Sequence, residues 1–149
     1  MEYRRAVFVL PYTKTESGIQ YLLLKRKKHW HGWEFSKGGI EKRETKEQTA
    51  RRELHEETGR RALKIKHFPY SGEYKYNRLF STRPGMIGQS FTLFAAEIKK
   101  GKVKLDRKEH SGHKWVAFSN ALKMLKWADQ RKSLRIVNSW LMHGRKEKK

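Results

Sequence analysis

Cysteine is absent from the 149-residue sequence, and long apolar runs are missing as well. Without cysteine, the chain can form neither disulfides nor cysteine-based zinc sites or nucleophiles, which favours an intracellular, cytoplasmic protein. The apolar run Ala6–Leu10 is too short for a signal peptide or a membrane helix and suits a strand instead. We therefore expect no membrane-spanning segment.

Acidic residues are scarce, since 15 Asp and Glu stand against 36 Lys and Arg, and the formal charge is +21 with a pI of about 10.4. A field of this sign attracts polyanions such as nucleotides, RNA, DNA and anionic membranes. The charge therefore indicates a class of partner and no particular reaction. Two basic clusters stand out, Lys25–Lys28 and Arg145–Lys149.

The length suits one domain, and no linker, repeat or low-complexity block divides the chain. We expect a single domain over residues 1–144, followed by a basic, flexible tail at 145–149. Short apolar runs rich in β-formers predict four strands, at Ala6–Leu10, Tyr21–Lys25, Ser90–Ile98 and Lys114–Ala117. The polar segment Thr13–Gly18 between the first two predicts a hairpin.

Three helices are expected. Thr45 followed by Gln48 fits a capping box and Gly59 fits a C-terminal stop, so a helix should lie between them. Apolar residues at helical spacing predict two more, at Ser119–Trp127 and Asp129–Met142, and the first residue of each is expected to be its N-cap. The glycine-rich, aromatic segment Gly32–Ile40 is expected to be a loop that leads into the first helix.

The first helix carries the most informative pattern. Glu53 lies three and four residues before Glu56 and Glu57, so the three carboxylates can project over one face. Ala50 and Leu54 would pack the other face against the sheet. Close carboxylates repel one another, and three oxygen ligands beside a glycine loop are what a hard cation such as Mg²⁺ requires. Such an ion also bridges substrate phosphates and activates water.

The segment from Gly38 to Gly59 resembles the Nudix box of the Nudix hydrolase family. The matching positions are Gly38, Glu44, Arg52, Glu53, Leu54, Glu56, Glu57 and Gly59. Only Arg60 departs, because an aliphatic residue is usual there, and this affects local packing more than chemistry. The resemblance implies an α/β Nudix fold, an α/β/α sandwich with a mixed sheet that has the box helix on one side and the C-terminal helices on the other. It also implies hydrolysis of a pyrophosphate bond in a nucleoside polyphosphate with Mg²⁺, for which Mn²⁺ can substitute.

The same resemblance implies roles for individual residues. Gly38 would offer its carbonyl to the metal, which Glu53, Glu56 and Glu57 would hold. Arg52 and Glu44 would orient these carboxylates, and Gly59 would support the site as the helix stop. The base that activates water stays open among Glu53, Glu97 and Glu109; Glu97 interrupts an apolar strand, and either binds something or lies at a water-exposed strand end.

Two further segments look like the asymmetrical diadenosine tetraphosphate hydrolase branch of the family. Trp33–Gly38 is similar to its Trp-x-Phe-Pro-Lys-Gly motif, with Ser36 in place of proline, and implies that Trp33 and Lys37 contact substrate. Lys108–Val116 matches a second motif more loosely and suggests His110 as a phosphate contact. Aromatic residues that could stack on adenine or pack in the core are Tyr74, Tyr76, Phe80 and Phe91.

The expected substrate is therefore a bis(5′-nucleosyl) tetraphosphate such as diadenosine tetraphosphate. The charge of +21 keeps an RNA 5′-triphosphate pyrophosphohydrolase as an alternative, with RNA as partner. A nucleoside triphosphate-sanitising pyrophosphatase is a further alternative. From another class, a non-catalytic nucleotide- or RNA-binding module also remains, although the intact carboxylates argue against it. We expect neither a membrane partner nor a predictable protein partner.

Overall fold

The computed structural model describes residues 2–76 and 83–147, and side chains up to His143. Its centre is the predicted hairpin, formed by β1 (Glu2–Thr15) and β2 (Gly18–Arg26), which pair antiparallel with Thr15 facing Gly18. The strands extend beyond their apolar runs because pairing continues almost to the turn. The expected hairpin is confirmed.

A mixed sheet grows from this hairpin. β1 pairs parallel with β6 (Met86–Glu97), which pairs antiparallel with the edge strand β5 (Lys64–Lys75). β5 was not predicted, because its residues are mostly polar and exposed, as an edge strand allows. On the other side of the hairpin, β2 pairs with β7 (His110–Val116), which confirms the last predicted strand and begins it four residues earlier.

The segment expected to be a loop, Gly32–Ile40, is instead two short strands. β3 (Gly32–Glu34) pairs with β2, and β4 (Ser36–Gly39) pairs antiparallel with β1 so that Gly38 faces Val7. Pairing of β3 with the preceding strand β2, and of β4 with the remote strand β1, overrides the low strand propensity of glycine here. The prediction was wrong, and the consequence is a segment held rigidly on the sheet just before the first helix.

That helix, α1 (Lys46–Thr58), has the predicted ends. The Gln48 N–H donates to Thr45 Oγ1 at 3.1 Å and the Thr45 N–H donates to Gln48 Oε1 at 2.9 Å, a complete capping box. Gly59 ends the helix with a φ of 72°, a left-handed conformation that glycine adopts without strain. Ala50 and Leu54 are buried against the sheet, as expected.

The two C-terminal helices are α2 (Phe118–Met124) and α3 (Ala128–Glu147). α2 begins after Ala117, which makes no side-chain capping bond, so the expected cap at Ser119 is wrong. α3 includes residues 145–147 of the predicted tail, and residues 148–149 lie outside the described chain. The tail's flexibility therefore stays a prediction. No described helix combines the length and apolar character needed to cross a membrane.

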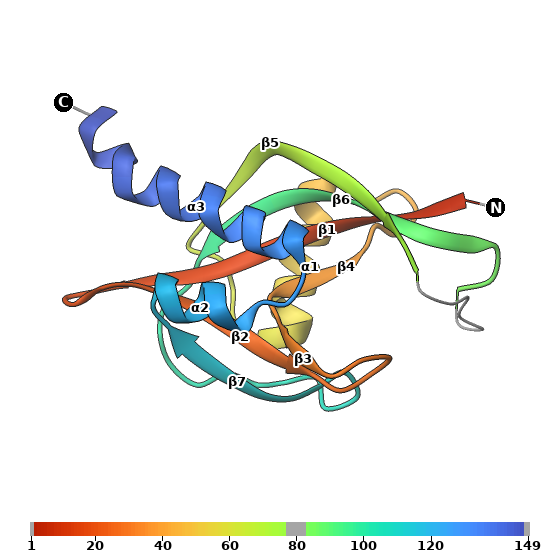
Figure 1. Cartoon of the computed structure of the whole chain (residues 1–149), viewed down its shortest axis with the longest axis horizontal. Coiled ribbons are helices and arrows are strands. Elements are labelled where there is room, and N and C mark those ends of the chain that lie inside the picture. The colour runs from red at the N-terminus through yellow and green to blue at the C-terminus, as the bar shows by residue number, and fades with distance from the viewer. Residues whose placement is uncertain (1, 77–82, 148–149) are drawn as a thin grey trace.

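Each face of the sheet has its own core. Alternate residues of β1 separate the two: Val7 and Val9 face α1, whereas Phe8 and Leu10 face α2 and α3. Figure 1 shows α1 behind the sheet and the other two helices in front of it. The α/β/α sandwich with a mixed sheet is confirmed, and the carboxylates of α1 lie where this helix meets β4.

Candidate functional site

Glu53 on α1 lies directly against the backbone of β4. A Cβ atom built on Gly38 would overlap the Glu53 carboxyl group, so only glycine allows this approach. The Glu53 side chain is 12% exposed. Burial raises its pKa to about 7; Arg52 opposes the shift and the charge of Glu56 adds to it. The structure thus brings together Gly38 and Glu53, as the sequence pattern predicts.

Glu57, one helical turn further on, is buried and unpaired. It is 1% exposed, and neither of its carboxylate oxygens has a hydrogen-bond partner among the described residues. Burial raises the pKa of Glu57 well above its ordinary value, and the charges of Glu34 and Glu53 add to this effect. An unpaired buried carboxylate is costly unless a ligand compensates it.

Arg52 connects four groups around these carboxylates. Its Nε and Nη2 donate to the two oxygens of Glu44 at 2.6 and 3.0 Å, and Nη2 also donates to the Gly39 carbonyl at 3.0 Å. Its Nη1 donates to Glu53 at 2.8 Å and to Glu56 at 3.3 Å. The hydrogen bonds from Arg52 hold the pKa of Glu44 at about 2, so Glu44 anchors the guanidinium as a carboxylate.

The carboxylates of α1 offer the kind of donor that Mg²⁺ prefers. The available ligands are all oxygens, which a hard cation prefers, and the Glu57 oxygens lack other partners. No three described His, Asp or Glu side chains converge as a ready metal cluster, since Glu56 turns outward to Arg52 and is 54% exposed. An ion shared by Glu53, Glu56 and Glu57 therefore requires Glu56 to leave Arg52. The chemistry of these donors, all of them oxygens, fits a hard divalent cation.

Glu34, on β3, is a site residue that the sequence reasoning missed. It is fully buried, with Arg26 Nη1 at 3.2 Å, Lys37 Nζ at 3.4 Å and His110 Nε2 at 2.7 Å. Burial opposes ionisation of Glu34, but Lys37, His110 and Arg26 outweigh it and lower the pKa to about 2. A glutamate between Trp33 and Phe35 on a short strand was the signal in the sequence.

The two base candidates outside α1, Glu109 and Glu97, lie at different distances from the carboxylates of that helix. Glu109 lies near the carboxylates, since its charge raises the pKa of both Glu53 and Glu57, and its Oε1 is 4.0 Å from Arg26 Nη1. Glu97 instead faces Tyr12 at the far end of β6.

Tyr12 lies five residues along β1 from Val7, which faces Gly38, and that is about 17 Å of strand. Burial and then the charge of Glu97 raise the pKa of Tyr12 to about 12. The prediction of Glu97 as a base was wrong, because the residue lies at a strand end remote from the site.

Two predicted substrate contacts are core residues instead. His110 is fully buried against Glu34, and its Nδ1 has no hydrogen-bond partner among the described residues, so it cannot be a surface phosphate contact. Phe91 is 2% exposed and stacks on Phe8 with ring centroids 4.1 Å apart. This burial overturns the predicted phosphate contact of His110, and for Phe91 it decides in favour of core packing, one of the two roles left open.

Other predicted contacts remain accessible. Lys37 is 15% exposed and lies 6.0 Å from the ring centroid of Trp30. Trp33 is half-buried, with Lys114 Nζ 5.5 Å from its ring centroid. Tyr76 is half-buried, and its hydroxyl lies 3.1 Å from both Gln89 Oε1 and Arg83 Nη1. Phe80 falls outside the described residues.

An aromatic pair that was not predicted lies beside Lys37. Trp30 and Trp127 pack edge to face with centroids 5.5 Å apart, and Trp127 is 38% exposed. Lys126 Nζ is 4.8 Å from the Trp127 ring centroid. The pair joins the segment before β3 to the start of α3, so two regions remote in sequence supply one aromatic surface. Its sequence signal was weak, because Trp30 and Trp127 lie far apart in the sequence.

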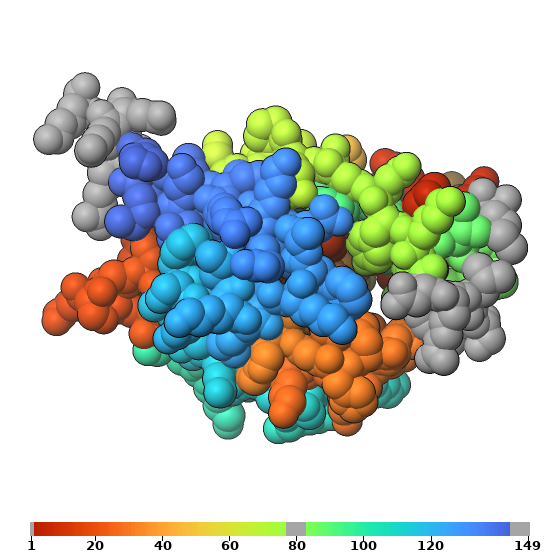
Figure 2. Space-filling view, viewed as in Figure 1, coloured from red at the N-terminus to blue at the C-terminus, as the bar shows by residue number. Residues whose placement is uncertain are grey.

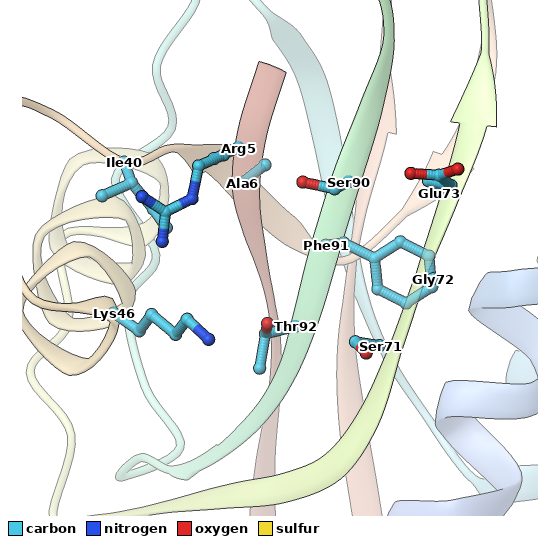
Figure 3. A pocket seen from close by; sticks show the side chains of 10 residues that line it. All are labelled: Arg5, Ala6, Ile40, Lys46, Ser71, Gly72, Glu73, Ser90, Phe91 and Thr92. Carbon is cyan, nitrogen blue, oxygen red and sulfur yellow. The ribbon is translucent and has the colours of Figure 1, made fainter. Parts of the chain in front are cut away.

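A separate polar groove of about 360 Å³ lies on the α1 face of the sheet. Figure 3 shows the side chains of Arg5 and Lys46 directed toward this space, with the hydroxyls of Ser90 and Thr92 on β6. The carboxylates of α1 do not line this groove, so it is distinct from the site described above.

The chain is similar to known proteins both in sequence pattern and in fold. The profile of the NUDIX domain family matches residues 2–136. A protein from Listeria monocytogenes described as a NUDIX hydrolase is 25% identical, with 97% of both chains covered and a TM-score of 0.80. A Caenorhabditis elegans Ap4A hydrolase in a binary complex is 23% identical, with 93% of this chain and 98% of that chain covered and a TM-score of 0.75.

The NUDIX domain of Shewanella oneidensis NrtR, complexed with ADP ribose, is 19% identical, with 95% of this chain and 90% of that chain covered and a TM-score of 0.76. No functionally curated protein matches this chain in sequence at a significant level. The similar folds therefore belong to proteins with different ligands, so they leave the choice of substrate open.

Proposed function

The chain belongs to the Nudix family and is a pyrophosphohydrolase of that family, and we propose that it cleaves a bis(5′-nucleosyl) tetraphosphate with Mg²⁺. The observation that carries this proposal is the buried carboxylate of Glu57, without a partner and beside Glu53. Two further observations support the choice of substrate, the position of Lys37 and the aromatic pair Trp30–Trp127.

Mg²⁺ would be held by Glu53, Glu56, Glu57 and the carbonyl of Gly38. The ion supplies charge neutralisation for the phosphates and lowers the pKa of a bound water. Mn²⁺ prefers the same oxygen ligands and is expected to substitute. The buried Glu57 oxygens support this assignment, because they have no hydrogen-bond partner among the described residues and are available to a cation. Gly38 supports it as well, because its missing side chain leaves room for the Glu53 carboxyl group.

The protein's own groups have separate tasks in this proposal. Arg52, fixed by Glu44, holds Glu53 and the Gly39 carbonyl in place, so Glu53 is oriented before substrate binds, whereas Glu56 must still leave Arg52 to join it. With Glu97 remote, Glu109 and Glu53 remain as base candidates. We favour Glu109, because Glu53 is engaged by Arg52, whereas the Glu109 side chain is 27% exposed and, within the described residues, its carboxylate forms an ion pair only with Arg26, at 4.0 Å.

Lys37 and the aromatic surface would bind the substrate. Lys37 Nζ, between Glu34 and the Trp30 ring, can move to contact phosphate oxygens as a point charge. Trp127, with an exposed face beside Trp30, can stack on a base. Lys114, on β7, lies over the ring of Trp33, on β3, and Tyr76 stays a candidate for the second nucleoside.

A second candidate activity is removal of pyrophosphate from the 5′ triphosphate of RNA. The charge of +21 favours it, since each neutralised phosphate adds affinity for a strand and adds little for a free dinucleotide. Sanitising of nucleoside triphosphates is the third. Cytoplasmic localisation, in keeping with the absence of cysteine, is part of the same proposal.

A panel assay with Mg²⁺ tests the proposal: diadenosine tetraphosphate, normal and oxidised nucleoside triphosphates, ADP-ribose and triphosphorylated RNA, each at two salt concentrations. We expect the highest kcat/KM for diadenosine tetraphosphate, with weak salt dependence. Strong, salt-sensitive turnover of RNA with none of the dinucleotide would establish the second activity instead. Calorimetric binding of a nucleotide without phosphate release would identify a non-catalytic binding module.

A further inference from the structure

A groove of about 600 Å³ lies between α3 and the edge strand β5, on the face of the sheet away from α1. β5 contributes Lys66 and Phe68, and α3 contributes Lys132, Arg135, Ile136 and Trp140. Figure 2 shows α3, in blue, lying against β5, in yellow-green, along one side of the molecule. None of the residues assigned above to catalysis or metal binding lines it.

The floor of the groove is aromatic. Phe68 is 4% exposed, and Trp140 packs edge to face on it, with centroids 5.5 Å apart and an interplanar angle of 82°. Trp140 itself is only half-buried. Lys66 Nζ lies 5.2 Å from the Trp140 ring centroid and 5.5 Å from that of Phe68. A flat apolar ligand could therefore lie on Trp140 with a cation at its edge.

The rim of the groove is basic and unneutralised. Lys66, Lys132 and Arg135 are exposed, and none of them forms an ion pair with a carboxylate in the described part of the chain. No described residue that lines the groove is acidic. Asp129, at the start of α3, accepts a hydrogen bond from the Tyr70 hydroxyl at 3.3 Å. The groove thus combines uncompensated positive charge with an aromatic floor.

We propose that this groove binds single-stranded nucleic acid, with phosphates at Lys132 and Arg135 and a base on Trp140. Aromatic platforms beside cationic tracks bind single strands because every base can stack and every phosphate attracts the cations. Lys132 and Trp140 are eight residues apart on α3, about 12 Å, which corresponds to roughly three or four stacked nucleotides.

The groove also lies on a path from the carboxylate site. α3 starts one residue after Trp127, which contacts Trp30 beside Lys37. A strand held along α3 would therefore extend toward Trp127 at one end. The inference rests on the groove alone, and it holds whichever nucleotide the enzyme cleaves.

Fluorescence anisotropy with the full chain and a labelled 12-residue oligouridylate that carries no 5′ phosphate tests the proposal. The variant Lys132→Glu/Arg135→Glu removes two rim charges from the groove. Its control, Lys99→Glu/Lys100→Glu, makes the same change in net charge at two exposed residues in the loop that follows β6, away from α3. We expect the groove variant to bind about tenfold or more weakly and its salt slope to fall by about 2, with a much smaller loss in the control.

Hydrolysis of a small nucleotide should be unchanged in both double variants, which separates this proposal from the proposed function. Equal loss of binding in both would overturn it, because attraction would then come from net charge alone. The contribution of Trp140 is measured with an abasic 12-mer of equal charge. We expect the wild-type protein to bind it several-fold more weakly than oligouridylate, and Trp140→Leu to lose this preference.

If Trp140→Leu fails to fold, the affinities of the wild-type protein for oligouridylate and for the abasic 12-mer still show whether bases stack in the groove. Equal affinity for the abasic strand would contradict stacking and so overturn the proposal. A 12-residue polyglutamate that competes as well as oligouridylate would assign the groove to an acidic protein partner and would also overturn it.

Discussion

Glu34 and Glu57 are both buried inside the protein, close enough for the charge of Glu34 to raise the pKa of Glu57, yet of the two, only Glu34 forms ion pairs with cations among the described residues. Arg26 and Lys37 compensate Glu34, whose pKa falls to about 2. Glu57 has no comparable partner among the described residues. Glu34 is therefore a structural carboxylate, whereas the carboxylate of Glu57 is available to bind a ligand.

The first prediction concerns stability in acid. Because the folded pKa of Glu34 lies near 2, below its ordinary value of 4.5, its ionised form stabilises the fold above pH 4.5, and this contribution is lost as the pH falls toward 2. Glu34→Gln removes this contribution. Chemical denaturation at pH 7 and pH 3 should show a smaller difference in unfolding free energy for the variant than for the wild type. Equal differences would show that Glu34 is not held ionised by its partners.

The second prediction concerns the Arg52 fork. Arg52→Lys cannot donate to both Glu44 oxygens and to Glu53 together, so the carboxylates lose their fixed orientation. We expect kcat/KM to fall about 10- to 100-fold with the fold retained. Arg51→Lys is the control, because Arg51 is exposed and pairs only with Glu47 on the surface. Equal activity in the two variants would leave Arg52 without a role in the site.

The third prediction concerns Gly38. Gly38→Ala places a methyl group where the Glu53 carboxyl lies, so Glu53 must move. We expect Mn²⁺ affinity, measured by calorimetry, to fall about 10-fold or more and stability to fall by about 1–3 kcal/mol. Gly112→Ala, on β7, meets no atom within 4 Å and should change neither quantity. Unchanged Mn²⁺ binding in Gly38→Ala would separate this glycine contact from the metal.

The fourth prediction separates the two late glutamates. Glu109→Gln should lower kcat about 10²- to 10⁴-fold, the usual effect of removing a base. Glu97→Gln, at the far end of β6, should leave kcat within about twofold of the wild type, because it cannot reach the carboxylate site. Loss of turnover in Glu97→Gln with full turnover in Glu109→Gln would reverse the assignment.

Local signals predicted the elements whose stability is largely local. The capping box at Thr45 and the stop at Gly59 defined α1, and compact apolar runs located the hairpin. β5 escaped prediction because an edge strand with polar residues forms only through pairing with β6. β4 escaped for a similar reason, since its pairing partner β1 is remote in sequence, whereas β3 is a three-residue strand that is stabilised by pairing with β2.

In the candidate site, too, residues defined by local geometry were predicted and residues joined by tertiary contacts were not. The fixed spacing on α1 identified Glu53, Glu56 and Glu57, because helical geometry alone brings them near one another. Glu34 and His110 meet only through the pairing of β2 with β3 and β7, and this tertiary contact has no signature in a local pattern. Strand alternation likewise decides that Phe91 packs in the core.

The most direct test of the central claim, that Glu57 belongs to a metal-dependent hydrolytic site, is the Mg²⁺-dependent turnover of Glu57→Gln. Glutamine has a similar volume and lacks the charge that a cation requires, and it removes a buried, unpaired carboxylate, so the fold should remain intact by circular dichroism. We expect nearly all turnover of diadenosine tetraphosphate to be lost at every Mg²⁺ concentration. Turnover close to that of the wild type, in a folded Glu57→Gln protein, would contradict it.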